Sequence, residues 1–106
     1  MKLCVTAQGN NLDAPIDPNF GRCRYFLFVD TDTLQFEAVE NPNVQASGGA
    51  GTNSGQLIAN RNVDALLTGD VGPNASRVLT SAGVNVVTQI TGTVREAVAA
   101  YITGAS

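Results

Sequence analysis

The order of the apolar segments along the chain limits its fold more than any other property of the sequence. Three apolar runs come first, at residues 3–7, 25–29 and 34–40, with only loops and a tight turn at 31–33 between them. Two more runs, at 64–68 and 84–87, are separated by helical patterns. Strands joined by a hairpin are antiparallel, whereas strands joined through a helix are parallel with right-handed crossovers. The sequence therefore predicts an α/β fold of order β-β-β-α-β-α-β-α, with a mixed five-stranded sheet and helices on its faces.

The ends of the helices carry local signals. We expect the first helix from about Thr52 or Ser54 to Asn62. The second helix opens at Pro73, which is preorganised for the first helical position, and ends at Gly83. The third follows a capping box that begins at Thr93. The apolar faces predicted for the last two helices are Ala75, Val78, Leu79 and Ala82, and Val94, Ala97, Val98, Tyr101 and Ile102.

The length and net charge of the chain exclude some classes of function. The 106 residues fit one domain, spanning 1–106, and 43% hydrophobic residues supply a core. The net charge of −3 argues against binding long nucleic acids, which requires a basic face. We find no signal peptide and no apolar segment of membrane-spanning length. With only two cysteines, both expected to be reduced thiols, the sequence predicts a cytoplasmic protein.

One stretch, residues 17–30, combines a turn, a glycine, two arginines and a thiol directly before an apolar strand. Cys23 lies between Arg22 and Arg24, and cationic neighbours favour the thiolate, which ligates metals and attacks electrophiles. Alternatively, Cys23 is a small, partly buried residue before a strand. We expect the arginines to bind an anionic ligand, or else to form a salt bridge with Asp17 or Asp13 or simply to be solvated. Phe20 is expected to anchor the loop, and Cys4 to lie in the core.

The predicted topology brings three loops to one edge of the sheet. If the second strand is antiparallel to the first and the fourth is parallel to it, segments 20–24, 42–55 and 69–72 all lie at the carboxyl end of the first strand. Ligands of open α/β sheets bind in the crevice at such an edge. The turn at Gly69–Gly72 precedes a helix N-terminus, which favours anions, but an ordinary strand-to-helix turn explains the same residues. No catalytic constellation is recognisable, and the absence of histidine excludes imidazole chemistry.

An ordered set of short motifs resembles the dinitrogenase iron–molybdenum cofactor biosynthesis family, which includes NifX-like proteins and the C-terminal region of NifB-like proteins. The motifs extend over nearly the whole chain. They are Asp17-x-x-Phe20-Gly21-Arg22-x-x-x-Phe26, Glu40-Asn41-Pro42, the glycine-rich middle loop, Gly69-x-x-Gly72, Gly83-Val84 and Gly92-Thr93-Val94. The resemblance implies a ribonuclease H-like three-layer fold without nuclease activity. It also implies binding or carrying of metal–sulfur clusters or their precursors.

One branch of this family carries an anionic molybdenum–copper sulfide cluster. Members often have histidines in the middle loop, where this chain has Gln45 to Gly49 and no histidine. That leaves Cys23 with backbone amides, or electrostatic attraction alone, to hold a cluster. The residues that the resemblance and the topology together assign to the cluster are Phe20, Gly21, Arg22, Cys23, Gly48, Gly49, Gly51, Thr52, Gly69, Asp70 and Gly72, with Cys23 as the metal ligand.

The resulting hypothesis is a non-enzymatic carrier of an anionic metal–sulfur cluster, of iron–molybdenum or molybdenum–copper type. A metal-cluster assembly protein or a redox protein is the expected partner. Two alternatives remain open. The first is a partner-binding module without its own cluster, which an exposed apolar patch along the third strand would favour. The second is a small-ligand-binding protein of unknown type, such as an enzyme that binds a small molecule or a nucleotide.

Overall fold

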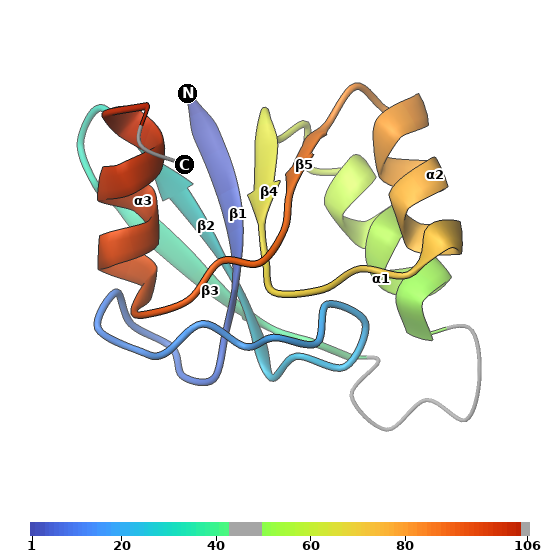
Figure 1. Cartoon of the computed structure of the whole chain (residues 1–106), viewed down its shortest axis with the longest axis horizontal. Helices are drawn as coiled ribbons and strands as arrows, with labels where there is room; N and C mark the ends of the chain where they lie inside the picture. The colour runs from blue at the N-terminus through green and yellow to red at the C-terminus, as the bar shows by residue number, and fades with distance from the viewer. Residues whose placement is uncertain (43–49, 105–106) are drawn as a thin grey trace.

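The computed structural model describes residues 1–42 and 50–104 of the chain. Its elements follow the predicted order (Figure 1). The strands are β1 (Lys2–Ala7), β2 (Tyr25–Asp30), β3 (Phe36–Glu40), β4 (Ala65–Leu67) and β5 (Asn85–Val87), and the helices are α1 (Ala50–Ala59), α2 (Pro73–Ser81) and α3 (Val94–Ile102). No helix in these described ranges is long and apolar enough to cross a membrane.

The strands form one five-stranded sheet in the order β3-β2-β1-β4-β5. β1 pairs antiparallel with β2, and β2 with β3, whereas β1 and β4, and β4 and β5, are parallel. The predicted mixed sheet is therefore confirmed; the ribonuclease H-like assignment stays a prediction. The chain moves to the other side of β1 after β3, so the carboxyl end of β1 is the edge at which ligands of open sheets are expected.

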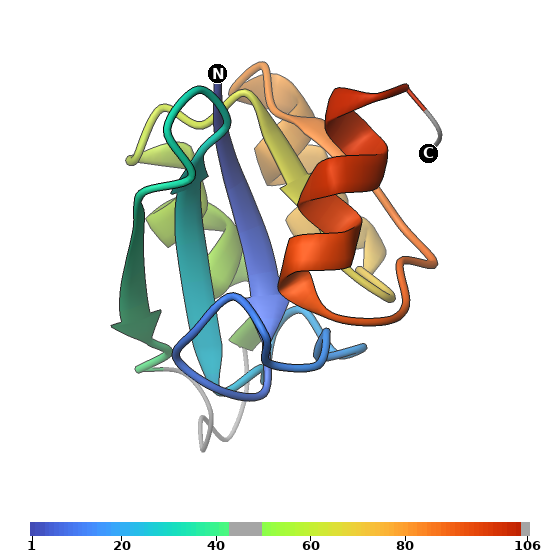
Figure 2. The ribbon, with the colours of Figure 1, turned by 90° about the vertical axis from the view of Figure 1, so that its left-hand side faces the viewer.

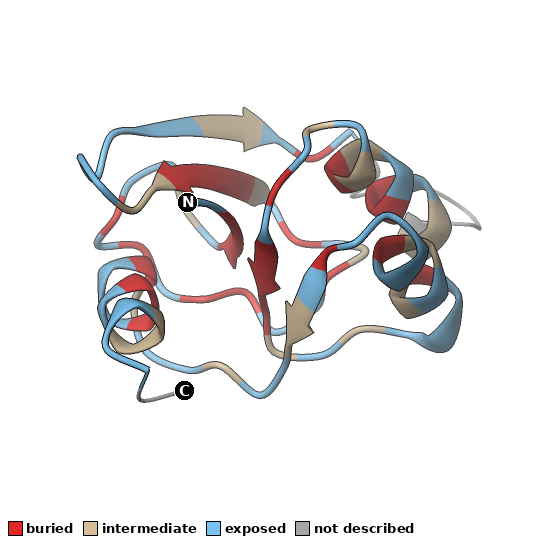
Figure 3. Cartoon of the chain, turned by 90° about the horizontal axis from the view of Figure 1, so that it is seen from above, coloured by how far each residue is buried: buried red, intermediate tan, exposed pale blue. Residues whose placement is uncertain are grey.

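Helices cover both faces of the sheet in three layers. α3 lies on one face and the α1–α2 pair on the other (Figure 2). Because side chains alternate across a strand, Leu3 and Val5 of β1 pack toward α3, whereas Cys4 packs toward α1 and α2. Burying each large apolar side chain contributes about 1.5–3 kcal/mol, so these two clusters hold the layers together. β3 has no buried residue and forms the exposed edge of the sheet (Figure 3).

The predicted signals at the ends of the last two helices are confirmed. Gly72 is the N-cap of α2 and Pro73 is its first residue. Thr93 accepts a hydrogen bond from the backbone N–H of Glu96, whose carboxylate accepts one from the N–H of Thr93, so the capping box of α3 is complete. Gly83 has φ of +82°, a conformation that side chains rarely adopt, which explains a glycine after α2.

Two expected boundaries are wrong. The third strand begins at Phe36 and not at Leu34, because Leu34 adopts φ of +60° and belongs to the turn. The first helix begins at Ala50, earlier than expected, and ends at Ala59, and Asn62 has φ of +57°, which is incompatible with a helix. The segment 50–55 is thus helical although it is rich in glycine.

The predicted apolar faces each contain one wrong residue. Ala82 lies after the last residue of α2 and is exposed, and Val78 is only partly buried. In α3 the buried residues are Val94, Ala97 and Val98, whereas Ile102 is 51% exposed. The helical period identifies the correct stripe, but it does not show how far the neighbouring layer extends along each helix.

Candidate functional site

The segment 17–24 follows the loop after β1, and the carboxylate of Asp17 fixes its path. One oxygen accepts a hydrogen bond from the N–H of Asn19 at 3.0 Å, and the other from the N–H of Arg24 at 3.3 Å. The backbone of Asp17 exchanges two hydrogen bonds with Thr6 of β1, one through the Thr6 hydroxyl at 2.7 Å. Both ends of the loop are therefore tied to the centre of the sheet.

A second segment joins this loop from the start of α2. Asn19 and Asp70 form an isolated parallel bridge, in which the N–H of Phe20 donates to the Asp70 carbonyl at 3.2 Å. The N–H of Asp70 donates in turn to the Pro18 carbonyl at 2.8 Å. These hydrogen bonds bring residues 18–20 and 69–72 together at the edge that the topology predicts.

A third segment comes from the end of β3 and the first turns of α1. The side-chain amide of Asn41 donates to the carbonyls of Gly21 at 3.1 Å and Cys23 at 2.8 Å. The hydroxyl of Ser54 in α1 donates to the same Gly21 carbonyl at 3.2 Å. The predicted meeting of three segments at one edge is thus confirmed for the described residues, at the lower edge of the molecule in Figure 1.

These segments enclose a shallow hollow of about 340 Å³, which we call the rim hollow. Its lining is Asn19, Phe20, Gly21, Arg22, Gly51, Asp70 and Gly72. Gly51 lies in the first turn of α1, and Gly72 caps α2, so two helix N-termini border the hollow. Neither helix has an acidic residue in its first turn, so both dipoles retain their attraction for anions. The guanidinium of Arg22 adds a positive charge, and the carboxylate of Asp70 opposes it.

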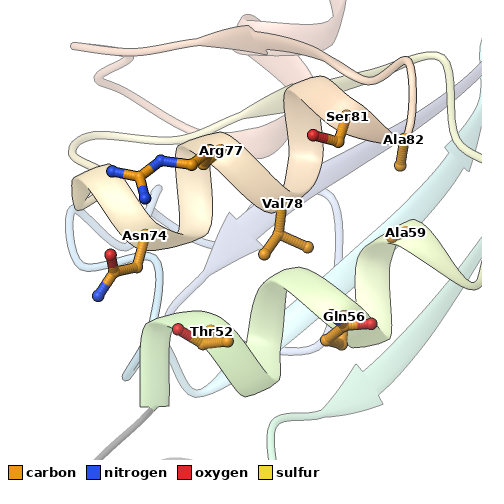
Figure 4. Close-up of a pocket in the computed structure, with 8 residues that line it drawn as sticks. All are labelled: Thr52, Gln56, Ala59, Asn74, Arg77, Val78, Ser81 and Ala82. Carbon is orange, nitrogen blue, oxygen red and sulfur yellow. The ribbon is translucent and has the colours of Figure 1, made fainter.

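The structure brings together most, but not all, of the residues predicted for the site. Phe20, Gly21, Arg22, Gly51, Asp70 and Gly72 line the rim hollow. Thr52 instead lines a separate groove of about 590 Å³ between α1 and α2, with Gln56, Asn74 and Arg77 (Figure 4). Gly69 lies behind the hollow against Pro18 and is not part of its lining. Gly48 and Gly49 lie outside the described residues.

Of the two interpretations of Cys23, the structure contradicts the thiolate and supports the alternative of a buried residue before a strand. Arg22 and Arg24 are exposed, but the side chain between them points inward and is fully buried in the cluster beneath α1 and α2. Burial raises the pKa of the Cys23 thiol far above its usual value; the negative charge of Asp17 raises it further, and a hydrogen bond from Asn41 only partly opposes this. Cys23 lies between a turn at 21–22 and the start of β2 at Tyr25, and this local path places the thiol inside while the two arginines stay exposed.

Metal ligands do not gather anywhere in the described ranges: no three His, Cys, Asp or Glu side chains there could hold an ion. Cys4 is fully buried, as predicted for a core residue. Phe20, expected to be a loop anchor, is 2% exposed, with its ring centroid 5.8 Å from that of Phe26. The chemistry that the rim hollow offers is therefore attraction of an anion by amides, helix N-termini and one guanidinium.

Three residues of this region are missing from the sequence prediction. Asn19 lines the hollow, and Asn41 and Ser54 hold its loop. The sequence shows Asn41 only as part of the Glu40-Asn41-Pro42 motif, although an asparagine that follows a strand and precedes a proline is typical of a turn held by side-chain hydrogen bonds to the backbone. Ser54 gives no such signal, because a serine near the start of an expected helix does not show which neighbouring loop its hydroxyl reaches.

Comparisons with known proteins agree with this architecture. Residues 1–104 match the family model described as dinitrogenase iron-molybdenum cofactor. An uncharacterized protein of Methanocaldococcus jannaschii is 31% identical over 107 residues, which cover 98% of this chain and 87% of that protein. The orange protein of Desulfovibrio gigas, solved in its apo form, is 40% identical with a TM-score of 0.93, covering 98% of this chain and 88% of that one.

A NifB-like protein from Thermotoga is 33% identical, with a TM-score of 0.83 over 98% of this chain and 89% of its own. The family model thus spans nearly the full length of the chain, and the similar structures share its fold from end to end. The chain belongs to the dinitrogenase iron-molybdenum cofactor family.

Proposed function

We propose that this protein is a non-enzymatic carrier of an anionic metal–sulfur cluster or its precursor, and that the cargo binds at the rim hollow. The observation that carries the proposal is the meeting of two helix N-termini with Arg22 around one hollow. Free N–H groups at a helix start attract anions, and a guanidinium is well suited to bind them. Family membership supports a role in handling the iron–molybdenum cofactor or related clusters.

The proposal assigns the contacts with the cargo to Arg22, Gly21, Gly51 and Gly72, and not to Cys23. A thiol that is buried and held in its neutral form by its surroundings offers no ligand to a cluster at the surface. The carboxylate of Asp70 on the same hollow repels an anion and so opposes the attraction of Arg22 and the helix N-termini.

Reconstitution of the purified protein tests this function. The protein is titrated with tetrathiomolybdate, with and without copper, and uptake is followed by visible absorption and metal analysis. We expect stoichiometric uptake and NMR shifts at residues 19–22, at the start of α1 and at 70–74. Absence of stoichiometric uptake would overturn the carrier role, whereas uptake with shifts confined to other surfaces would overturn the site. Free molybdate is the control, because it is an oxyanion of similar charge to tetrathiomolybdate but without its sulfur atoms.

A second candidate function, partner binding without a cluster, is favoured by one observation. Phe36 on the edge strand β3 and Leu34 in the preceding turn are each 40% exposed, as expected of apolar contacts for a partner along this strand. A pull-down without metal, comparing the wild-type protein with Phe36→Glu, tests this candidate. Loss of a specific partner in the variant supports it; equal recovery by both proteins, or by neither, counts against it.

A further inference from the structure

Buried polar side chains gather beneath one loop of this protein. Among the described residues they are Thr6, Asp17, Asn41, Ser54 and Thr68. Asp17, Asn41 and Ser54 hydrogen-bond the segment 19–24 directly, Thr6 holds the backbone of Asp17, and Thr68 lies 2.8 Å from the Thr6 hydroxyl. Burying a polar group is costly unless it is hydrogen-bonded. The buried polar groups of the described residues thus hold the loop that forms the rim hollow in its shape.

Asn41 is central to this arrangement, because one side-chain amide holds two carbonyls of the loop. Its Nδ2 lies 3.1 Å from the Gly21 oxygen and 2.8 Å from the Cys23 oxygen. Its own backbone N–H donates to the Arg24 carbonyl at 2.9 Å, which prolongs the ladder between β2 and β3. The side chain is therefore carried on a fixed strand, and it can be changed without removing the backbone hydrogen bond.

The direction of these carbonyls determines what the loop presents to the outside. In a trans peptide the C=O and the following N–H point to opposite sides. The peptide from Cys23 to Arg24 follows this rule, with its carbonyl bonded to Asn41 and its N–H to Asp17. The peptide from Gly21 to Arg22 has its carbonyl turned toward Asn41 and Ser54, so the N–H of Arg22 points to the opposite side.

We propose that Asn41 is a positioning residue for the rim hollow. By holding the Gly21 carbonyl inward, it fixes the orientation of the peptide that carries Arg22 and keeps the loop in the form that receives an anion. The inference rests on the proposed function, because it assigns Asn41 a role in the affinity of that same site. Asn41 does not line the hollow, so it acts through Gly21 and Cys23 and does not touch the cargo.

The experiment compares three variants with the wild-type protein, using tetrathiomolybdate as the probe. Asn41→Ala removes both hydrogen bonds to the loop carbonyls together with the long one to the Cys23 sulfur, and Ser54→Ala removes one of the two that reach Gly21. Val98→Ala in α3 is the control, because it destabilises the core on the other face of the sheet without contact with the loop. If Asn41→Ala does not fold, Asn41→Ser replaces it. Affinity, thermal midpoint and the NMR shift of the Arg22 amide on adding probe are measured.

We expect Asn41→Ala to weaken probe binding about tenfold, which corresponds to the net free energy of one ordinary hydrogen bond. Ser54→Ala should weaken it about twofold to threefold, because one hydrogen bond to Gly21 remains. The probe-induced shift of the Arg22 amide should shrink in the same order. Val98→Ala should lower the thermal midpoint and leave affinity unchanged.

Equal affinity in the wild type and Asn41→Ala would overturn the positioning role and leave the carrier function standing. Equal losses of affinity in Asn41→Ala and Val98→Ala would also overturn it, because the loss would then follow from general destabilisation of the protein. Failure of the wild type itself to bind the probe would instead refute the carrier function.

Discussion

Gly69 lies so close to Pro18 that a Cβ on Gly69 would stand 2.5 Å from the Pro18 Cα. The nearest obstacle is backbone, which cannot swing aside as a flexible side chain can. The glycine is therefore required by the approach of two loops, the one before the segment 19–24 and the one that leads into α2. Gly69, which the sequence suggests for anion binding, is therefore a glycine because no larger residue fits against Pro18.

The same substitution at two glycines of this turn should have opposite outcomes. Gly69→Ser is expected to destabilise the protein by about 1–3 kcal/mol, the cost typical of overpacking. Gly72→Ser places its Cβ in open space at the N-cap of α2, where serine is a preferred residue, and should leave stability equal or higher. Urea unfolding of both variants measures the difference, and equal stability of the two would contradict the steric account.

The two buried hydroxyls under the loop should behave as a coupled pair. Thr6 donates to the Asp17 carbonyl, so its partner Thr68 donates to Thr6. Thr6→Val leaves the buried Thr68 hydroxyl without this partner and is expected to cost about 1–3 kcal/mol, whereas Thr68→Val keeps the bond to Asp17 and should cost less. The double variant should lose less stability than the sum of the two single losses, which a double-mutant cycle measures. Strict additivity would contradict the coupling.

Alkaline pH should destabilise the protein through its thiols. Burial raises the pKa of both Cys4 and Cys23 above the usual thiol value of 9.0. A folded-state pKa that is raised gives stability that is present below pH 9 and is lost as the pH rises, because the unfolded chain releases protons that the folded chain keeps. Thermal midpoints should therefore fall above about pH 9, and less steeply in the Cys4→Ala, Cys23→Ala double variant.

Native Cys23 should also resist iodoacetamide at pH 8 and react after unfolding in guanidinium, because a buried neutral thiol is a poor nucleophile. Mass spectrometry of the two reactions gives the number of alkylated thiols. Rapid alkylation of Cys23 in the folded protein would show that the thiol is accessible after all.

The two arginines beside Cys23 offer a matched test of the rim hollow. Both are exposed, but only Arg22 is in the lining. Arg22→Ala is expected to weaken tetrathiomolybdate binding about tenfold to a hundredfold, the range for a hydrogen bond to a charged group. Arg24→Ala removes an equal charge from a residue that does not line the hollow, so its effect on binding affinity should be much smaller. The loss should also diminish at high salt, because salt screens exposed charges.

Much of the fold follows from the sequence because the deciding signals are local. Proline at the start of α2, the capping box of α3 and Gly83 fix the ends of the helices, and the helix connections make β4 and β5 parallel to β1. The turn at Leu34 and the early start of α1 were not predicted, because Leu34 has no usual preference for positive φ and the start of α1 is rich in glycine.

The site was predictable in its place but not in its inner construction. The meeting of three segments follows from strand direction alone. The inward side chain of Cys23 depends on the turn that precedes β2, and the roles of Asn41 and Ser54 depend on distances that only the folded backbone sets. Cys23 is therefore a core residue, while Asn41, which the sequence names only within a family motif, holds the loop.

The buried polar groups beneath the 19–24 loop separate the framework of the rim hollow from its lining. Asp17, Asn41 and Ser54 set the backbone path from below, whereas Asn19, Arg22 and Asp70 project from it at the surface. Exposed residues of this kind can be exchanged at little cost to folding. Substitutions in the lining, whether in evolution or in design, can therefore change the charge and shape offered to a cargo while the buried framework stays the same.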